Sequence, residues 1–321
     1  MRHVAFFLNP LLTKHSRRRA IVDRCAALLR NTGCTVEMQD TVSACSAGEQ
    51  ARSAVESGFD TIFVCGGVGT FFQVLQGVAG SDAALGVIPL GTGNVLAQNL
   101  RMPRDPVIAF QEQLNAEAVS IPLGEVTCGG FDEASGGEGK RSWYFTIAAG
   151  MGIHAALMNL AQNGSGKRLW GRAAYYAGGL RLLFKHPIQV FDVELTGADG
   201  EVRSFRTSEL LSVRVPAINR WRPGGDLCSP EFRVATVPQS SRLGLAHASF
   251  HALVTRKSNG GSRLPYPHYE GATKVVCKPA AGILYRAPLL VEADGEVIGV
   301  EQATFSMAQQ RLRLLWPNRA G

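Results

Sequence analysis

Two glycine-rich stretches, each between an apolar run and a helical pattern, have the composition of phosphate-binding turns. The stretch Gly66-Gly67-Val68-Gly69-Thr70 follows TIFVC, and Gly91-Thr92-Gly93-Asn94 follows GVIPL. A helix N-terminus presents unpaired backbone N–H groups and the positive end of its dipole, and glycine lets a phosphate approach them closely. Thr70, Thr92 and Asn94 add side-chain hydrogen bonds. Either loop alone is equally well explained as an ordinary turn of an α/β sheet, but two such loops on neighbouring strands favour the binding of one polyphosphate by both.

The elements that would position these loops follow an alternating pattern of strands and helices. Residues 4–9 form the continuous apolar run of a buried parallel strand, and Ser16 is a candidate N-cap for the helix after it. Alternation of this kind predicts an open, doubly wound parallel sheet. Further strands are predicted at 35–40, 61–65 and 85–90, with helices at 46–57 and from residue 94.

The pattern changes after about residue 120, where short apolar and β-branched runs are separated by turns. Such spacing predicts an antiparallel sandwich. One helical segment, residues 165–186, mixes basic and aromatic side chains. That mixture suits the surface of an anionic membrane, while aromatic packing beneath a solvated basic face explains it equally well.

Bulk properties restrict the partners and the compartment. The chain has 321 residues and a net charge of +7, which favours acidic partners, but apart from Arg17–Arg19 its cations are dispersed, so nucleic acid is not expected. The seven cysteines form no C-x-x-C pair, so we expect neither a disulfide framework nor a zinc site. A cytoplasmic protein is predicted, in contact with membranes only peripherally.

Four motifs in order make the chain resemble the diacylglycerol kinase catalytic family, which includes sphingosine, ceramide and bacterial lipid kinases. They are Asn9-Pro10, the loop at 66–70, the stretch Pro89-Leu90 with the loop at 91–94, and Asp294-Gly295-Glu296. The resemblance implies an α/β nucleotide-binding domain, like those of NAD kinases and phosphofructokinases, followed by a β-sandwich. We expect the first domain at 1–121, completed by 305–321, and a lipid-binding second domain at 122–304.

The family reaction implied by this resemblance is transfer of the ATP γ-phosphate, with Mg²⁺, to a lipid hydroxyl of the diacylglycerol or sphingoid-base type. Asn9, Pro10 and both glycine loops would bind ATP, Glu296 would take the hydroxyl proton, and Asp294 would lie beside it near the metal or substrate. An Asp-Gly pair between apolar strands is also a common two-residue hairpin turn, so the last motif has a purely structural alternative.

Several positions depart from the family pattern. Val68 stands where the family has an aspartate, and Gln73, His154 and Pro122 replace acidic residues common elsewhere in it, while the region from Gly224 to Arg233 is shorter than usual. A valine neither coordinates Mg²⁺ nor accepts a proton, and loss of such a group costs roughly 10² to 10⁴ in kcat. Three hypotheses follow: a working lipid kinase, a catalytically impaired relative that binds nucleotide or lipid, and a kinase acting on a soluble acceptor.

Overall fold

A computed structural model describes residues 1–42, 46–131, 139–163, 188–218, 223–238, 268–285 and 287–317. The chain divides into two compact units, one of residues 1–123 with 308–321 and the other of residues 124–307. The predicted helix at 165–186 lies outside the described residues. Within them, no helix is long and apolar enough to cross a membrane.

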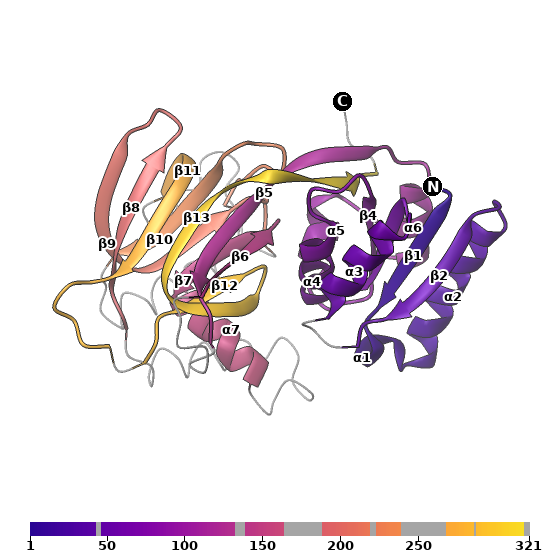
Figure 1. The fold of residues 1–321 in the computed structure, drawn as a ribbon, viewed down its shortest axis with the longest axis horizontal. Helices are drawn as coiled ribbons and strands as arrows, with labels where there is room; N and C mark the ends of the chain where they lie inside the picture. The colour runs from indigo at the N-terminus through magenta and orange to yellow at the C-terminus, as the bar shows by residue number, and fades with distance from the viewer. Residues whose placement is uncertain are drawn as a thin grey trace. The chain divides into compact units, whose positions relative to one another are not determined.

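The first unit is an α/β domain built on a parallel sheet (Figure 1). Its strand order is β2-β1-β3-β4-β13, in which β13 adds its last residues beside β4. Helices α2 and α6 contact each other, as do α3 and α4, and α4 also contacts β3 while α6 contacts β4. The strands are β1 (His3–Leu8), β2 (Thr35–Asp40), β3 (Thr61–Gly66) and β4 (Ala84–Pro89), and the helices are α1 (Pro10–Thr13), α2 (Ser16–Arg30), α3 (Ala47–Glu56), α4 (Val68–Val78), α5 (Val95–Asn99) and α6 (Pro106–Leu114).

Continuous apolar runs form the central strands because both faces of a parallel sheet are covered. Every residue of β3 and β4 is buried, and the rings of Phe6, Phe63 and Phe110 pack together in the core, with centroids 4.9 to 5.9 Å apart. The predicted N-cap at Ser16 is wrong. The N-cap is His15, whose side chain makes no capping hydrogen bond, and Ser16 is the first helical residue.

The second unit is an antiparallel β-sheet domain with one described helix, α7 (Ile153–Asn163), in the parts of the chain that the structure covers. Its long strands change partners along their length: β9 pairs first with β8 and then with both β10 and β7. The α/β fold class followed by a β domain is confirmed. The remaining strands are β5 (Ala118–Gly129), β6 (Lys140–Phe145), β7 (Ala148–Gly152), β8 (Phe191–Gly197), β9 (Val202–Val213), β10 (Phe232–Pro238), β11 (His268–Pro279), β12 (Leu290–Ala293) and β13 (Glu296–Leu315). The first residues of β5 and the last residues of β13 belong to the first unit.

Candidate active site

The two glycine loops touch each other at the carboxyl ends of neighbouring strands. A Cβ on Gly91 would lie 2.6 Å from the Cα of Gly67, a distance that real side chains do not show. The backbone N–H of Leu90 donates to the carbonyl of Gly66 at 3.1 Å, which fixes the second loop to the first. Glycine is therefore required at Gly91 by close backbone contact, beyond any need for a turn.

Asn9 joins the first glycine loop from the end of β1. Its Nδ2 donates to Oγ1 of Thr70 at 3.0 Å, and its Oδ1 accepts from the N–H of Leu11 to cap α1, whose first residue is Pro10. Thr70 is buried against Gly66, and its hydroxyl links the first glycine loop to Asn9. A hydroxyl that accepts one hydrogen bond still has its own hydrogen to donate to a ligand. Since β2 and β3 flank β1 on opposite sides, these residues lie where the strand order reverses, which is where ligands bind in open α/β sheets.

Helix α4 begins at Val68 with its backbone donors available. Its N-cap, Gly67, makes no side-chain capping hydrogen bond, and the first turn contains no acidic residue. The hydrogen bond from Phe71 N to Gly67 O, at 3.1 Å, starts the helical ladder. By helix geometry the N–H groups of Val68, Gly69 and Thr70 then lack intrahelical acceptors, which is the arrangement that binds anions.

Asn94 braces the second glycine loop. It has a left-handed backbone at φ 43°, and its Nδ2 donates to the carbonyls of Pro89 at 3.3 Å and Gly91 at 2.8 Å. Its Oδ1 is buried and accepts no hydrogen bond from the described residues. Helix α5, which follows Asn94, has only five residues and so has a weak dipole. For binding a ligand, this loop therefore offers its backbone shape and the exposed side chain of Thr92.

Asp294 and Gly295 form the turn between β12 and β13 in the second unit. Both have left-handed backbones, at φ 48° and 83°, and Ala293 pairs with Glu296 across them. This is the two-residue hairpin that the sequence left open as an alternative, and its geometry is that of a type I′ turn. Glu296 starts β13 and is partly exposed.

The carboxylate of Asp294 is buried and fully hydrogen-bonded. Its Oδ2 accepts from the N–H and the hydroxyl of Thr146, both at 3.0 Å, and its Oδ1 accepts from the N–H groups of Ile147 at 2.8 Å and Ala148 at 3.1 Å. Burial raises the pKa of Asp294 to about 6 against these bonds, so the group is ionised at neutral pH. Since a carboxylate has about four acceptor positions, Asp294 holds the turn to residues 146–148 and has little capacity left for a ligand.

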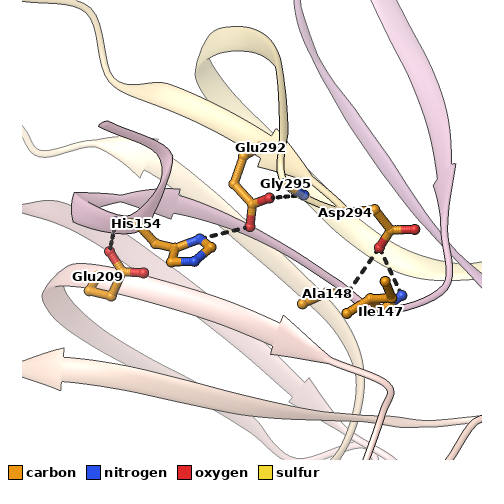
Figure 2. A network of polar contacts seen from close by, with 7 residues as sticks. All are labelled: Ile147, Ala148, His154, Glu209, Glu292, Asp294 and Gly295. Carbon is orange, nitrogen blue, oxygen red and sulfur yellow. Dashed lines mark hydrogen bonds and ion pairs between the residues drawn. The ribbon is translucent and has the colours of Figure 1, made fainter. Parts of the chain in front are cut away.

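A cluster of titratable side chains that the sequence did not predict lies beside this turn (Figure 2). His154 Nδ1 lies 3.2 Å from Oε1 of Glu292, and its backbone N–H donates to Oε2 of Glu209 at 2.7 Å. One feature of the sequence could have indicated this cluster, namely a glutamate at an inward position of an apolar strand. That residue is Glu292, which is 1% exposed.

The motif residues of the first unit match a known family. Residues 3–126 match the diacylglycerol kinase catalytic domain. This segment belongs to the diacylglycerol kinase catalytic domain family. The segment contains three of the four motifs, and the resemblance drawn from them is confirmed.

Individual relatives extend the comparison. A diacylglycerol kinase of Mycobacterium tuberculosis is 27% identical over 214 residues, which are 66% of this chain and 65% of that protein, so the match spans less than two thirds of the relative. A crystal structure of a diacylglycerol kinase from Bacillus anthracis has a TM-score of 0.67 at 15% identity and covers 99% of this chain and 97% of its own. A yeast NADH kinase has a TM-score of 0.51 at 10% identity, covering 98% and 83%. These two structures show the fold alone.

The candidate site of the first unit has features that suit phosphate better than a metal. Two touching glycine loops, a helix N-terminus and the unpartnered Oδ1 of Asn94 fit the phosphates and polar groups of a nucleotide. No group of three carboxylate, histidine or cysteine side chains able to hold a metal gathers among the described residues. Val68 and Gln73 also leave the first glycine loop and its helix without a carboxylate there, so no side chain of this loop is assigned to Mg²⁺.

Proposed function

We propose that the protein is a lipid kinase that transfers the γ-phosphate of ATP to a lipid hydroxyl of the diacylglycerol or sphingoid-base type. The observation that carries this proposal is the contact between the two glycine loops at the switch point of the sheet, which suits a polyphosphate. Membership of the diacylglycerol kinase catalytic domain family supports the reaction class.

In this proposal each unit binds one of the two substrates. The first unit binds ATP through Asn9, Pro10 and the residues of both glycine loops, and Mg²⁺ enters as the counterion of the ATP phosphates. The second unit binds the lipid, and Glu296 takes the proton of its hydroxyl as phosphate is transferred. Asp294 holds the turn that carries Glu296, supported by its four hydrogen bonds. The protein is cytoplasmic in this proposal and binds its lipid substrate by peripheral contact with the membrane surface.

A second candidate function is binding of nucleotide or lipid without efficient transfer. It is favoured by the first turn of α4, which contains Val68 and no acidic residue. Backbone donors survive such a substitution, and loss of a carboxylate removes repulsion toward an anion. Phosphate binding would therefore persist where transfer is slow.

The deciding experiment incubates the protein with γ-labelled ATP, Mg²⁺ and mixed micelles of diacylglycerol or sphingosine, with glycerol as a soluble acceptor. Wild type is expected to label a lipid, and Val68→Asp to raise kcat by about ten-fold or more, because positioned charged groups contribute on that scale. Binding of ATP without transfer, with transfer recovered in Val68→Asp, would establish the second candidate. Labelling of glycerol alone would assign a soluble acceptor.

A further inference from the structure

Three titratable side chains from three elements of the second unit meet beside the Asp294-Gly295 turn. His154 lies in the first turn of α7, Glu209 on β9 and Glu292 on β12. The carboxylate of Glu209 accepts the His154 backbone N–H at the beginning of α7, and the imidazole of the same residue contacts Glu292 (Figure 2). His154 therefore joins the helix to both strands.

The contact continues from Glu292 into the turn itself. While Oε1 of Glu292 faces His154, its Oε2 accepts the backbone N–H of Gly295 at 2.9 Å. Gly295 lies between Asp294, which is anchored to residues 146–148, and Glu296. The turn is thus held from two sides, by the carboxylate of Asp294 and by the His154–Glu292 pair.

The charge of this cluster depends on pH. The nearby carboxylates of Glu292 and Glu209 raise the pKa of His154 to about 9, although burial acts in the opposite direction. Burial raises the pKa of Glu209 to about 8, opposed by His154 and the N–H groups at the start of α7. These two glutamates are the titratable groups that act on the imidazole, and the protonation of His154 is coupled to that of Glu209.

We propose that His154 is a positioning residue for phosphoryl transfer, which it serves by holding Glu292 on the N–H of Gly295 and so fixing the direction of Glu296. The inference rests on the proposed kinase function. It assigns a role to a histidine where the family pattern has an acidic residue, and to Glu292, which lies outside the family motifs. Misplacement of a reacting group by about 1 Å can cost up to roughly 10²-fold in rate, so a tether at this turn matters.

The sign of the pH effect follows from the direction of the pKa shift. Because the pKa of His154 in the folded protein, about 9, lies above its ordinary value of 6.5, the contact of the imidazolium with Glu292 contributes its full stabilisation below pH 6.5. Its stabilisation is lost as pH rises through 9. The Gly295 tether should therefore weaken in alkali, where ionisation of Glu209 also adds a negative charge.

The tether can be tested without activity, by following the amide proton of Gly295 by NMR. In wild type its chemical shift should titrate between about pH 7 and pH 10, as the imidazolium is lost. His154→Gln and Glu292→Gln should abolish this titration, and His3→Gln, at an exposed histidine of the other unit, should leave it intact. A flat Gly295 signal in wild type, or the same titration in His154→Gln, overturns the inference.

The catalytic consequence is tested by kinetics with ATP and lipid micelles. His154→Gln and Glu292→Gln should lower kcat by about ten-fold and leave the KM for ATP unchanged, because the ATP loops are in the other unit. His154→Lys, which keeps a cation beside Glu292, should recover part of the loss. Wild-type kcat in both glutamine variants overturns the positioning role. Absence of transfer by wild type overturns the proposed function alone, and the amide titration then decides the tether by itself.

Discussion

The pentapeptide Ala-Asp-Gly-Glu-Val occurs twice in the second unit, at residues 198–202 and 293–297, and the two copies fold differently. In the first, Gly200 N donates to Gly197 O and Gly197 N donates to Glu201 O, which makes a three-residue loop with Gly200 at φ 80°. The second is a two-residue turn with left-handed backbone at Asp294 and Gly295. Identical local sequence therefore does not fix the turn type.

The surroundings of the two hairpins explain the difference. Asp199 is exposed and accepts the N–H of Glu201 at 2.9 Å, and Glu201 forms an exposed ion pair with Arg203. Asp294 is only 4% exposed and accepts its hydrogen bonds from residues almost 150 positions away in the sequence. Those bonds offset the cost of a left-handed aspartate. A motif of this kind becomes a candidate site only through the residues that surround it.

The largest contrast between the hairpins is expected in activity. Glu296→Gln should lower kcat for lipid phosphorylation by roughly 10² to 10⁴, because it removes the proposed base while keeping the size of the side chain. Glu201→Gln changes the same residue of the exposed copy and should leave the rate unchanged. Initial rates with saturating ATP and lipid measure both, and equal rates in the two variants would remove the distinction.

The second contrast is in stability. Asp294→Asn leaves one acceptor oxygen for a site that supplies four donors, and its amide group faces backbone N–H groups. We expect the free energy of unfolding to fall by about 2 to 4 kcal/mol. Asp199→Asn should change it by less than about 0.5 kcal/mol, because asparagine also forms this kind of turn. Urea unfolding at neutral pH compares the pair, and a small effect at both positions would mean that the buried bonds contribute little.

The smallest difference between the hairpins is expected at their glycines, where the same substitution should destabilise the protein equally. Gly200 and Gly295 both have positive φ, and an added Cβ would meet nothing within 4 Å at Gly200 and only Met158 Sδ at 3.9 Å at Gly295. Gly200→Ala and Gly295→Ala should therefore each cost about 1 to 2 kcal/mol from backbone strain alone. Thermal unfolding of the two variants should give matching shifts in Tm. A much larger loss at Gly295 would show that its turn is under constraints beyond the backbone.

The fold was predictable where a local pattern decides it. The apolar runs at 4–9, 61–65 and 85–90 became parallel strands within one residue of their predicted bounds, since burial on both faces requires such runs. The change of partners along β9 was not predictable, because it depends on pairing between distant segments. The Ser16 cap failed because capping depends on the approach of the preceding turn as well as on residue type.

The candidate site divides in the same way. Glycine loops between strand and helix can be recognised in sequence, because their composition follows from backbone geometry. The contact between Gly67 and Gly91 and the bond from Asn9 to Thr70 require the sheet order. His154 is 138 residues from Glu292 and 55 from Glu209, so no local pattern connects the three.

The central claim, that the two glycine loops together hold the phosphates of ATP, is tested most directly by calorimetric titration of ATP into wild type, Gly91→Ala and Gly93→Ala. A Cβ on Gly91 would collide with Gly67, whereas the nearest atom to one on Gly93 is Val95 Cγ2 at 4.0 Å. We predict that wild type binds ATP, that Gly91→Ala raises the Kd for ATP by about ten-fold or more, and that Gly93→Ala raises it far less. Absence of ATP binding by wild type, or equal affinity in all three proteins, would contradict the claim.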